Sequence, residues 1–400
     1  MLKKIILFYL SALLPLDAAE LIISSYNCGG LSHHFDYLRA ATMHKLMSER
    51  RQLEPEAMEL NARVQELALG LLFSKDEEEI AALQQSWNDE QCYERFMELV
   101  RHPKQPGSPS HAWYCKSQEM ITPYDVRPVL LFDKEVQAAV CYQMEDLGLN
   151  GRQEDWEEAL ARLRRSLFEK TVREHLLCDL LCFQEANYLD SSLFPEEYEL
   201  HISHTTPHSK KAIAWKKERF TRLPIVQSYN AMELGNFDNR SLILLLLDNE
   251  TQKKLLVISC HLPGCEPYGY EPIGYDHWLN DQWRDFMRGN NHLFNLLHQM
   301  QWIEADLVLL GLDANVAATH PRLRQLKDYQ FHIDYHTPFA ATCTNPNYML
   351  DTRIDWIALQ TRQGISATIE EIPLPAIQLN DIANNMSDHR PIKAKVTFTP

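Results

Sequence analysis

Six polar residues or short polar motifs stand where apolar segments of the chain end, and their types are those that bind metal ions, hold phosphate or transfer protons. In chain order they are Asn27, Gln184-Glu185, His261, Asp313-x-Asn315, Asp355 and Ser387-Asp388-His389. A carboxylate or imidazole at the end of a strand has a rigid backbone beneath it and open space beyond it. We therefore expect these side chains to converge on one pocket.

Each motif taken alone also has a simpler interpretation. A Gln-Glu pair after a strand is usually a solvated loop, Asp-x-Asn is usually a turn, and His261 could be a satisfied core histidine. Asp355 is different, because burying a lone carboxylate within an apolar segment is costly without a partner. His389 is the partner that we expect for it.

The segments that precede these residues have the length and pattern of short strands. They are residues 21–26, 178–184, 210–216, 241–248, 253–262, 306–313, 353–359 and 393–399. Asp248-Asn249-Glu250 is typical of a hairpin connection, and residues 281–303 are typical of a helix. Many strands with few helices between them predict an α/β fold of two packed sheets with helices on their outer faces.

The stretch between the first strand and Cys178 has a helical pattern instead. Its apolar residues recur at three- and four-residue spacing, as at Leu60, Val64, Leu67 and Leu71, which is typical of an amphipathic helix. Two further helices are predicted at 129–147 and 154–177.

Residues 1–19 predict a signal peptide. Lys3 and Lys4 precede an apolar run, Ile5–Leu14, that is too short to span a bilayer, and a small-residue pair, Ala18-Ala19, follows it. We therefore expect a secreted or periplasmic protein without a transmembrane segment. The nine cysteines include no Cys-x-x-Cys pair and do not fix the redox compartment.

The composition excludes several classes of protein. Of the 400 residues 45% are hydrophobic and 24% charged, and the formal net charge is −16. These values are typical of a globular protein and exclude a disordered chain, a coiled coil and a multi-span membrane protein. The acidic balance excludes a broad basic surface for nucleic acid, but not a nuclease that holds its substrate through a metal ion and one short basic segment.

Taken together, the motifs resemble those of the endonuclease/exonuclease/phosphatase superfamily. The order S-Y-N, Q-E, a strand-ending H-L, D-x-N, R-I-D and S-D-H matches that superfamily over residues 21–27 and 178–400. One departure is that Leu312 separates Gly311 from the Asp of the fourth motif. The resemblance implies a four-layer α/β/β/α sandwich in residues 20–400, interrupted by a helical insertion at about 41–176 after the first strand and helix.

The resemblance also implies hydrolysis of a phosphate ester with Mg²⁺, or Mn²⁺, as the cofactor. Glu185 would bind the metal, supported by Asn27 and Asp388, because Mg²⁺ prefers hard oxygen ligands. Asp313 would activate the attacking water, and Asn315 would hydrogen-bond the phosphate or the nucleophile.

Two imidazoles would act on the same phosphate. Asp355 would fix the tautomer of His389, which would bind the phosphate or transfer a proton. His261 would contact the phosphate as well and could serve as the general acid toward the leaving oxygen.

A basic segment, His208–Arg222, could receive an anionic substrate. The resemblance places its start beside the substrate groove, so Lys210 and Lys211 are expected to bind substrate together with Arg240. The alternative is an ordinary solvated run of charges.

The leading hypothesis is a metal-dependent, nuclease-like phosphodiesterase. One alternative is a phosphatase or sphingomyelinase-type hydrolase that acts on phosphoinositide or phospholipid headgroups. Another is a catalytically silent adaptor that binds a protein partner through the helical insertion. The complete set of polar strand ends favours an enzyme, whose partner would be a phosphate-ester substrate such as nucleic acid.

Overall fold

The computed structural model describes most of the chain. The described residues are 18–29, 55–100, 106–107, 111–112, 115, 134–187, 189–203, 210–225, 240–263, 277–337, 341–345, 350–362, 364–377, 387 and 389–399. Residues 1–17 of the expected signal peptide, the helix expected after the first strand, and Asp388 lie outside these ranges. None of the described helices is long and apolar enough to cross a bilayer.

One sheet has six strands in the order β12-β13-β1-β2-β4-β3. Its strands are β1 (Ala19–Asn27), β2 (Leu180–Gln184), β3 (Tyr198–Ile202), β4 (Ala212–Lys216), β12 (Ala367–Glu371) and β13 (Ile392–Phe398). Strands β1 and β2 are parallel, and the other pairs are antiparallel.

A second sheet has five strands in the order β11-β8-β7-β6-β5. They are β5 (Phe220–Leu223), β6 (Ser241–Asp248), β7 (Lys254–His261), β8 (Leu307–Asp313) and β11 (Asp355–Thr361). Here β7 and β8 are parallel and the other pairs are antiparallel. A separate pair is formed by β9 (Cys343–Asn345) and β10 (Leu350–Thr352).

The predicted strands lie within two residues of the observed ones, and the predicted hairpin at Asp248 joins β6 to β7. The helix predicted at 281–303 is α10 (His277–Met300). The segment predicted as one helix at 154–177 differs, because α9 (Gln153–Thr171) passes into a π-turn, Val172–Leu176. This turn closes where the amide of Leu177 bonds to the carbonyl of Val172.

The two sheets pack face to face, and side chains alternate between this interface and the outer faces. In β6, Leu242, Leu244 and Leu246 face the other sheet, while Ile243 and Leu245 belong to the outer core. A strand that is buried on both faces needs apolar residues at successive positions. This requirement explains the continuous apolar run of β6.

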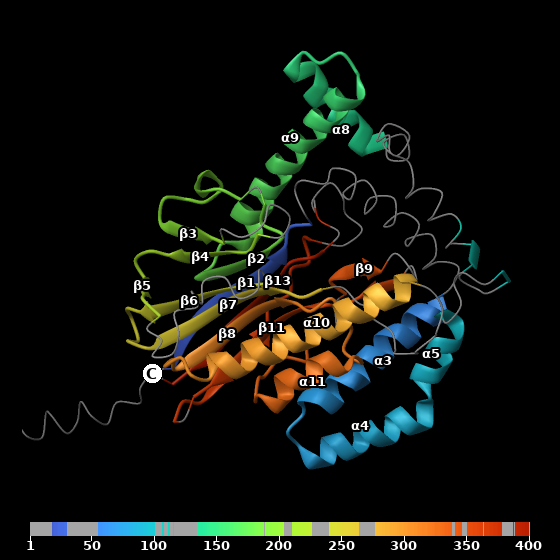
Figure 1. Cartoon of the computed structure of the whole chain (residues 1–400), viewed down its shortest axis with the longest axis vertical. Coiled ribbons are helices and arrows are strands. Elements are labelled where there is room, and N and C mark those ends of the chain that lie inside the picture. Colours follow the sequence, from blue (N-terminus) through green and yellow to red (C-terminus); the bar gives the residue numbers. More distant parts are fainter. Residues whose placement is uncertain are drawn as a thin grey trace, which may run out of the picture.

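Helices cover both outer faces (Figure 1). On the six-stranded sheet lies α9, whose Phe168 packs near Tyr26 and Phe183, and α8 (Lys134–Leu147) packs against α9. On the five-stranded sheet lie α10, α11 (Pro321–Asp328) and α3 (Pro55–Phe73). Helices α4 (Glu77–Glu90) and α5 (Cys92–Val100) pack beside α3. The helical stretch between β1 and β2 is therefore divided between the two faces.

A small polar network joins the sheets beneath one end of their interface. Gln184 of β2 is buried, and its Nε2 donates to Ser25 Oγ (3.2 Å), Ser259 Oγ (3.2 Å) and the carbonyl of Gly311 (3.3 Å). A Cβ atom on Gly311 would lie 2.6 Å from the Cβ of Cys182 in the opposite sheet. Gly311 therefore allows the two backbones to come closer than any other residue would.

Gly311→Ala should lower the free energy of unfolding by about 2 kcal/mol, the usual size of an overpacking effect in a tight core. In a Cys182→Gly background the same substitution should cost about 1 kcal/mol less, because the atom that it meets is gone. Urea titrations of the four proteins measure this coupling.

Gly70→Ala is the matched control, since its Cβ would lie 2.6 Å from Leu83 Cδ1, the end of a flexible side chain. This substitution should not lower the free energy of unfolding, because alanine is favoured over glycine within a helix. Equal costs for Gly311→Ala in both backgrounds would show that the close sheet contact is not the cause.

His320 makes stability depend on pH. It is buried, it caps α11 by accepting the amide of Arg322 at Nδ1 (3.0 Å), and burial, followed by the charge of Arg322, lowers its pKa to about 3. The unfolded chain takes up this proton below pH 6.5, whereas the folded chain does not. Stability should therefore fall by about 2 kcal/mol between pH 7.5 and 5 through this group.

His320→Asn keeps an oxygen to accept the capping hydrogen bond but removes the titrating ring. The difference in unfolding free energy between pH 7.5 and 5 should be about 2 kcal/mol smaller in the variant than in the wild type. An unchanged difference would contradict the assignment.

Candidate active site

The sheet topology places the predicted site residues at one end of the sheet interface. Strands β1 and β2 end side by side, as do β7 and β8, where His261 is the partner of Asp313. Because β11 runs antiparallel to β8, its first residue, Asp355, also lies opposite Asp313. The start of β13 lies beside the end of β1 for the same reason.

The alternation of side chains then decides which way the site residues point. Asn27 continues the inward-facing series of Leu21 and Ile23, and Asp313 continues that of Leu307 and Leu309. Side chains two residues apart in a strand share a face. His261 and Asp355 follow the same rule, so the polar ends of both sheets meet where the apolar interface stops.

Asp313 is the centre of the cluster. Asn27 Nδ2 donates to its Oδ2 (2.7 Å), and the backbone amide of Asn315 donates to its Oδ1 (2.9 Å). The Nε2 atoms of His261 and His389 lie 3.4 and 4.0 Å from Oδ2. One fully buried carboxylate thus contacts groups from both sheets.

Glu185 lies at the more open side of the cluster, where its side chain is 27% exposed. Its Oε1 is 3.4 Å from Asn27 Nδ2 and 3.7 Å from His261 Nε2. Its backbone has a φ of 50°, a left-handed conformation that is uncommon for a residue other than glycine. The chain turns sharply here, which directs the carboxylate toward Asn27.

Asp355 and His389 form a buried pair, with Oδ2 and Nδ1 2.9 Å apart. Thr342 Oγ1 accepts the amides of Ile354 and Asp355, each at 3.0 Å. Ser387 Oγ accepts the amide of His389 and donates to the carbonyl of Asn27. Both members of the pair are therefore held by neighbouring hydroxyl groups.

Burial dominates the electrostatics of the site. It raises the pKa of Asp313 to about 8, with the charge of Asp355 as the next cause. Burial and the charges of Lys211, His389 and Arg240 hold the pKa of His261 well below its usual range. His261 is accordingly neutral near pH 7, which disfavours it as a general acid in the free protein.

The three basic residues that we expected to bind substrate, Lys210, Lys211 and Arg240, differ in their surroundings. Lys211 is only 1% exposed, and burial lowers its pKa to about 8. Lys210 lies beside the turn that follows Glu185, and its backbone carbonyl accepts the amide of Ala186. The carbonyl of Arg240 accepts the amide of His261 (2.9 Å).

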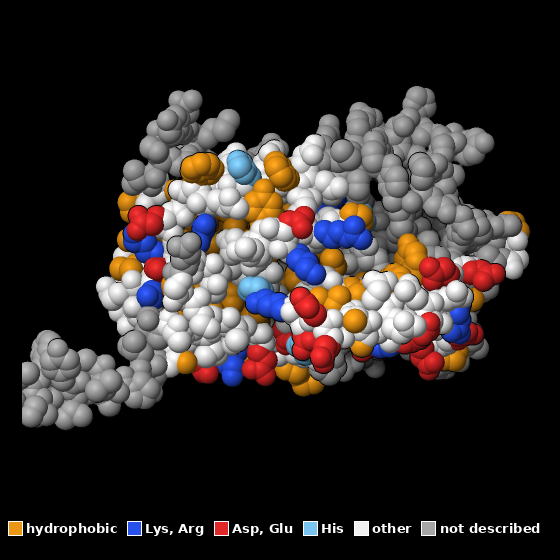
Figure 2. Space-filling view, turned by 90° about the horizontal axis from the view of Figure 1, so that it is seen from below, with side chains coloured by type: hydrophobic (Ala, Val, Ile, Leu, Met, Phe, Trp, Pro, Cys, Tyr) orange, Lys and Arg blue, Asp and Glu red, His pale blue; other side chains and the backbone are white. Residues whose placement is uncertain are grey.

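In the later part of the basic segment, the positive charges are paired with acidic side chains. Lys216 and Arg219 both pair with Asp179 at 3.0 Å. On the face shown in Figure 2, basic and acidic side chains likewise lie next to one another. Among the described residues of the predicted basic segment, Lys211 carries its charge near the cluster.

The donor set fits a divalent cation. Single ligand atoms of Asp313, Asp355 and His389 lie within 4.8 Å of one another. Within the described residues, Asp355 Oδ1 is buried and accepts no hydrogen bond. Carboxylate oxygens beside an imidazole suit Mg²⁺ or Mn²⁺.

Asn27, which we expected to support the metal, and Asn315, which we expected to contact the phosphate or the nucleophile, both use their side chains within the protein. Asn27 Oδ1 already accepts the amide of Gly29 (2.9 Å), so Asn27 presents its NH₂ group to the carboxylates. Asn315 uses its own NH₂ group to hold the carbonyl of Leu262 (2.9 Å), which fastens the end of β7. Asp388 lies outside the described residues.

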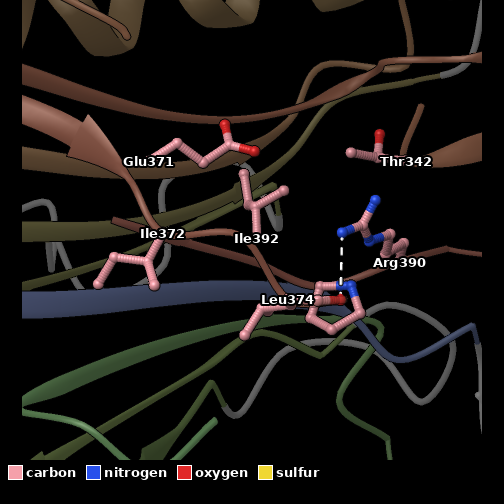
Figure 3. Close-up of a pocket in the computed structure, with 7 residues that line it drawn as sticks. Thr342, Glu371, Ile372, Leu374, Arg390 and Ile392 are labelled. Atoms are coloured by element: carbon pink, nitrogen blue, oxygen red, sulfur yellow. Dashed lines mark hydrogen bonds between the residues drawn. The ribbon is translucent and has the colours of Figure 1, made fainter. Parts of the chain in front are cut away.

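Thr342 is a contributor that the sequence did not reveal, because it acts through backbone amides and lies in no recognisable motif. It also borders a small pocket, drawn in Figure 3. The pocket is lined by Thr342, Glu371, Ile372, Leu374, Arg390, Pro391 and Ile392. Arg390 donates to the carbonyl of Leu374 there, and none of the predicted site residues lines it.

No protein-family model and no curated protein sequence matches the chain. Solved structures match part of it. The human Nocturnin catalytic domain with bound sulfate anion is 17% identical, and the match covers 60% of this chain and 87% of that one with a TM-score of 0.42. The Xenopus laevis APE2 catalytic domain is 18% identical, and the match covers 60% of this chain and 89% of that one with a TM-score of 0.41.

A third match is an endonuclease/exonuclease/phosphatase from Bacteroides vulgatus. It is 14% identical, and the match covers 60% of this chain and 93% of that one with a TM-score of 0.40. Identities and TM-scores this low do not transfer an activity from one protein to another, so the chemistry follows from the site's own residues. The Bacteroides protein belongs by name to the superfamily that the sequence motifs resemble.

Proposed function

We propose that the chain is a divalent-metal-dependent phosphoesterase of the endonuclease/exonuclease/phosphatase superfamily, with its four-layer α/β/β/α sandwich and a helical insertion between β1 and β2. The observation that carries the proposal is the cluster itself. Asn27 and Glu185 from one sheet lie within hydrogen-bonding or ion-pair distance of Asp313 and His261 from the other sheet. His389 lies 4.0 Å from Asp313 and pairs with Asp355.

Glu185 would hold a Mg²⁺ or Mn²⁺ ion; when bound, such an ion polarises a phosphoryl oxygen and neutralises developing charge. Glu185 suits this role because it is the most exposed carboxylate of the cluster. A substrate phosphate can therefore approach it from solvent.

Asp313 is the group best placed to accept a proton from the attacking water. Its two oxygens are fixed by donors, Asn27 Nδ2 and the amide of Asn315, so the carboxylate cannot rotate away. A base works best when its pKa lies near the working pH, and burial moves this carboxyl in that direction.

His389 is suited to hold a phosphate oxygen. Its Nδ1 is occupied by Asp355, which leaves Nε2 directed toward Asp313 and the substrate. The carboxylate stabilises the charged imidazole, so that Nε2 can donate a hydrogen bond to an anion.

The purified protein should hydrolyse bis(p-nitrophenyl) phosphate and plasmid DNA when Mg²⁺ or Mn²⁺ is added, and EDTA should abolish the reaction. His389→Ala and Glu185→Gln should each lower kcat by about 10²–10⁴, the range for lost proton transfer or charge stabilisation. Steady-state rates, together with circular dichroism to confirm folding, test this.

His298→Ala and Glu304→Gln are matched controls on exposed residues of the five-stranded side. Both should keep the wild-type rate. Full activity of the His389 and Glu185 variants in the presence of EDTA would refute the mechanism.

A panel of DNA, RNA, a phosphoinositide and sphingomyelin with added metal identifies the substrate class. We expect hydrolysis of nucleic acid, because Lys211 and Arg240 place positive charge beside the cluster. Turnover of the phosphoinositide or sphingomyelin alone would exclude the nuclease assignment but keep the phosphoesterase.

A further inference from the structure

We infer that Arg322 is a positioning residue for the proposed active site, and that its buried guanidinium sets the direction of the two segments that carry His261 and Asp313. The inference rests on the proposed function for its catalytic consequence. Arg322 lies in the first turn of α11 and is 0% exposed.

The guanidinium joins three elements. Its Nη1 donates to the carbonyls of Pro263 (2.9 Å) and Ala314 (2.6 Å), and its Nε donates to Asn290 Oδ1 on α10 (3.0 Å). Pro263 comes two residues after His261, and Ala314 comes directly after Asp313. A single side chain therefore holds the backbone just beyond both strand ends.

These segments need such a contact because the sheet ladder stops there. The last paired residues of β7 and β8 are His261 and Asp313. Asn315 has a φ of 50°, a left-handed conformation that asparagine tolerates better than most residues. Arg322 pulls the preceding carbonyl toward α11 and so helps to enforce the turn.

Gly289 provides the space for the guanidinium. A Cβ on Gly289 would lie 2.4 Å from Arg322 Nη2 and 2.8 Å from Cζ. Glycine within a helix costs about 1 kcal/mol relative to alanine. The glycine in α10 and the arginine in α11 therefore form one fitted pair.

Packing of α11 does not require this arginine. Leu323 and Leu326 of the same helix are fully buried in the core with the five-stranded sheet. A buried guanidinium is a costly way to fill space compared with an apolar side chain. Its planar fork can reach several acceptors at fixed angles, which a lysine cannot do.

The test compares Arg322→Lys, Arg322→Met and Gly289→Ala with the wild type on bis(p-nitrophenyl) phosphate. We expect kcat to fall 10- to 100-fold, as for other residues that orient a catalytic group, with little change in KM. Gly289→Ala keeps the arginine but displaces it, so it should show the same loss. Arg324→Met, an exposed arginine of the same helix, is the control and should match the wild type.

A second measurement does not depend on activity. Long-range ¹⁵N–¹H spectra report the ring nitrogens of His261 and His389, assigned through the His→Ala variants. Displacing Arg322 should change the His261 signals more than those of His389, because Asp355 and Ser387 hold that residue. If the wild type hydrolyses no phosphate ester, the proposed function fails while this spectrum still tests the positioning.

A purely structural role predicts a different result. The variants would then lose thermal stability while kcat per folded molecule and the His261 signals stay as in the wild type. That outcome for Gly289→Ala would overturn the inference, even if the Arg322 variants did not fold.

Discussion

The close approach of the two sheets at Gly311 is the constraint on which the rest of the site depends. Asn27 and Glu185 belong to one sheet and His261 and Asp313 to the other, so their distances are set by the gap between the sheets. That gap is narrow where Gly311 meets Cys182 and where Gln184 reaches across to the second sheet. A wider gap would separate Asn27 from Asp313 without changing either strand.

The site gathers three carboxylates in a region with little solvent, and its neighbours reduce the cost of doing so. Donors from Asn27 and Asn315 hold Asp313, and His389 holds Asp355. Burial, followed by the charge of the buried Lys211 nearby, lowers the pKa of His261 and keeps it neutral. A bound cation would complete this compensation, since buried charges are tolerated only with partners.

The sequence predicted the central strands well for a physical reason. A strand such as β6 is buried on both faces, so its apolar residues run without interruption. The edge strands β3, β5 and β12 were not predicted, because few of their residues are fully buried and their pattern is mixed. Helical periodicity located the helices but does not tell which sheet face each helix covers.

The convergence of the site could be predicted because the residues end neighbouring strands and keep the inward alternation. The supporting residues could not, because Thr342 and Arg322 act on backbone groups far away in sequence. For the basic segment, the sequence showed the residues but not their partners. Its charges were visible, but the pairing of Lys216 and Arg219 with Asp179 arises only in three dimensions.

The hydrogen bonds of the cluster join residues that are far apart in the chain, and this has a consequence for folding. Asn27 is separated by 286 positions from Asp313 and by 360 from Ser387. Contacts across such separations form late, because a long loop must be closed before they stabilise anything. The chain can thus acquire its helices and hairpins well before the polar cluster exists, and the cluster stays incomplete until strands from both ends of the polypeptide have paired.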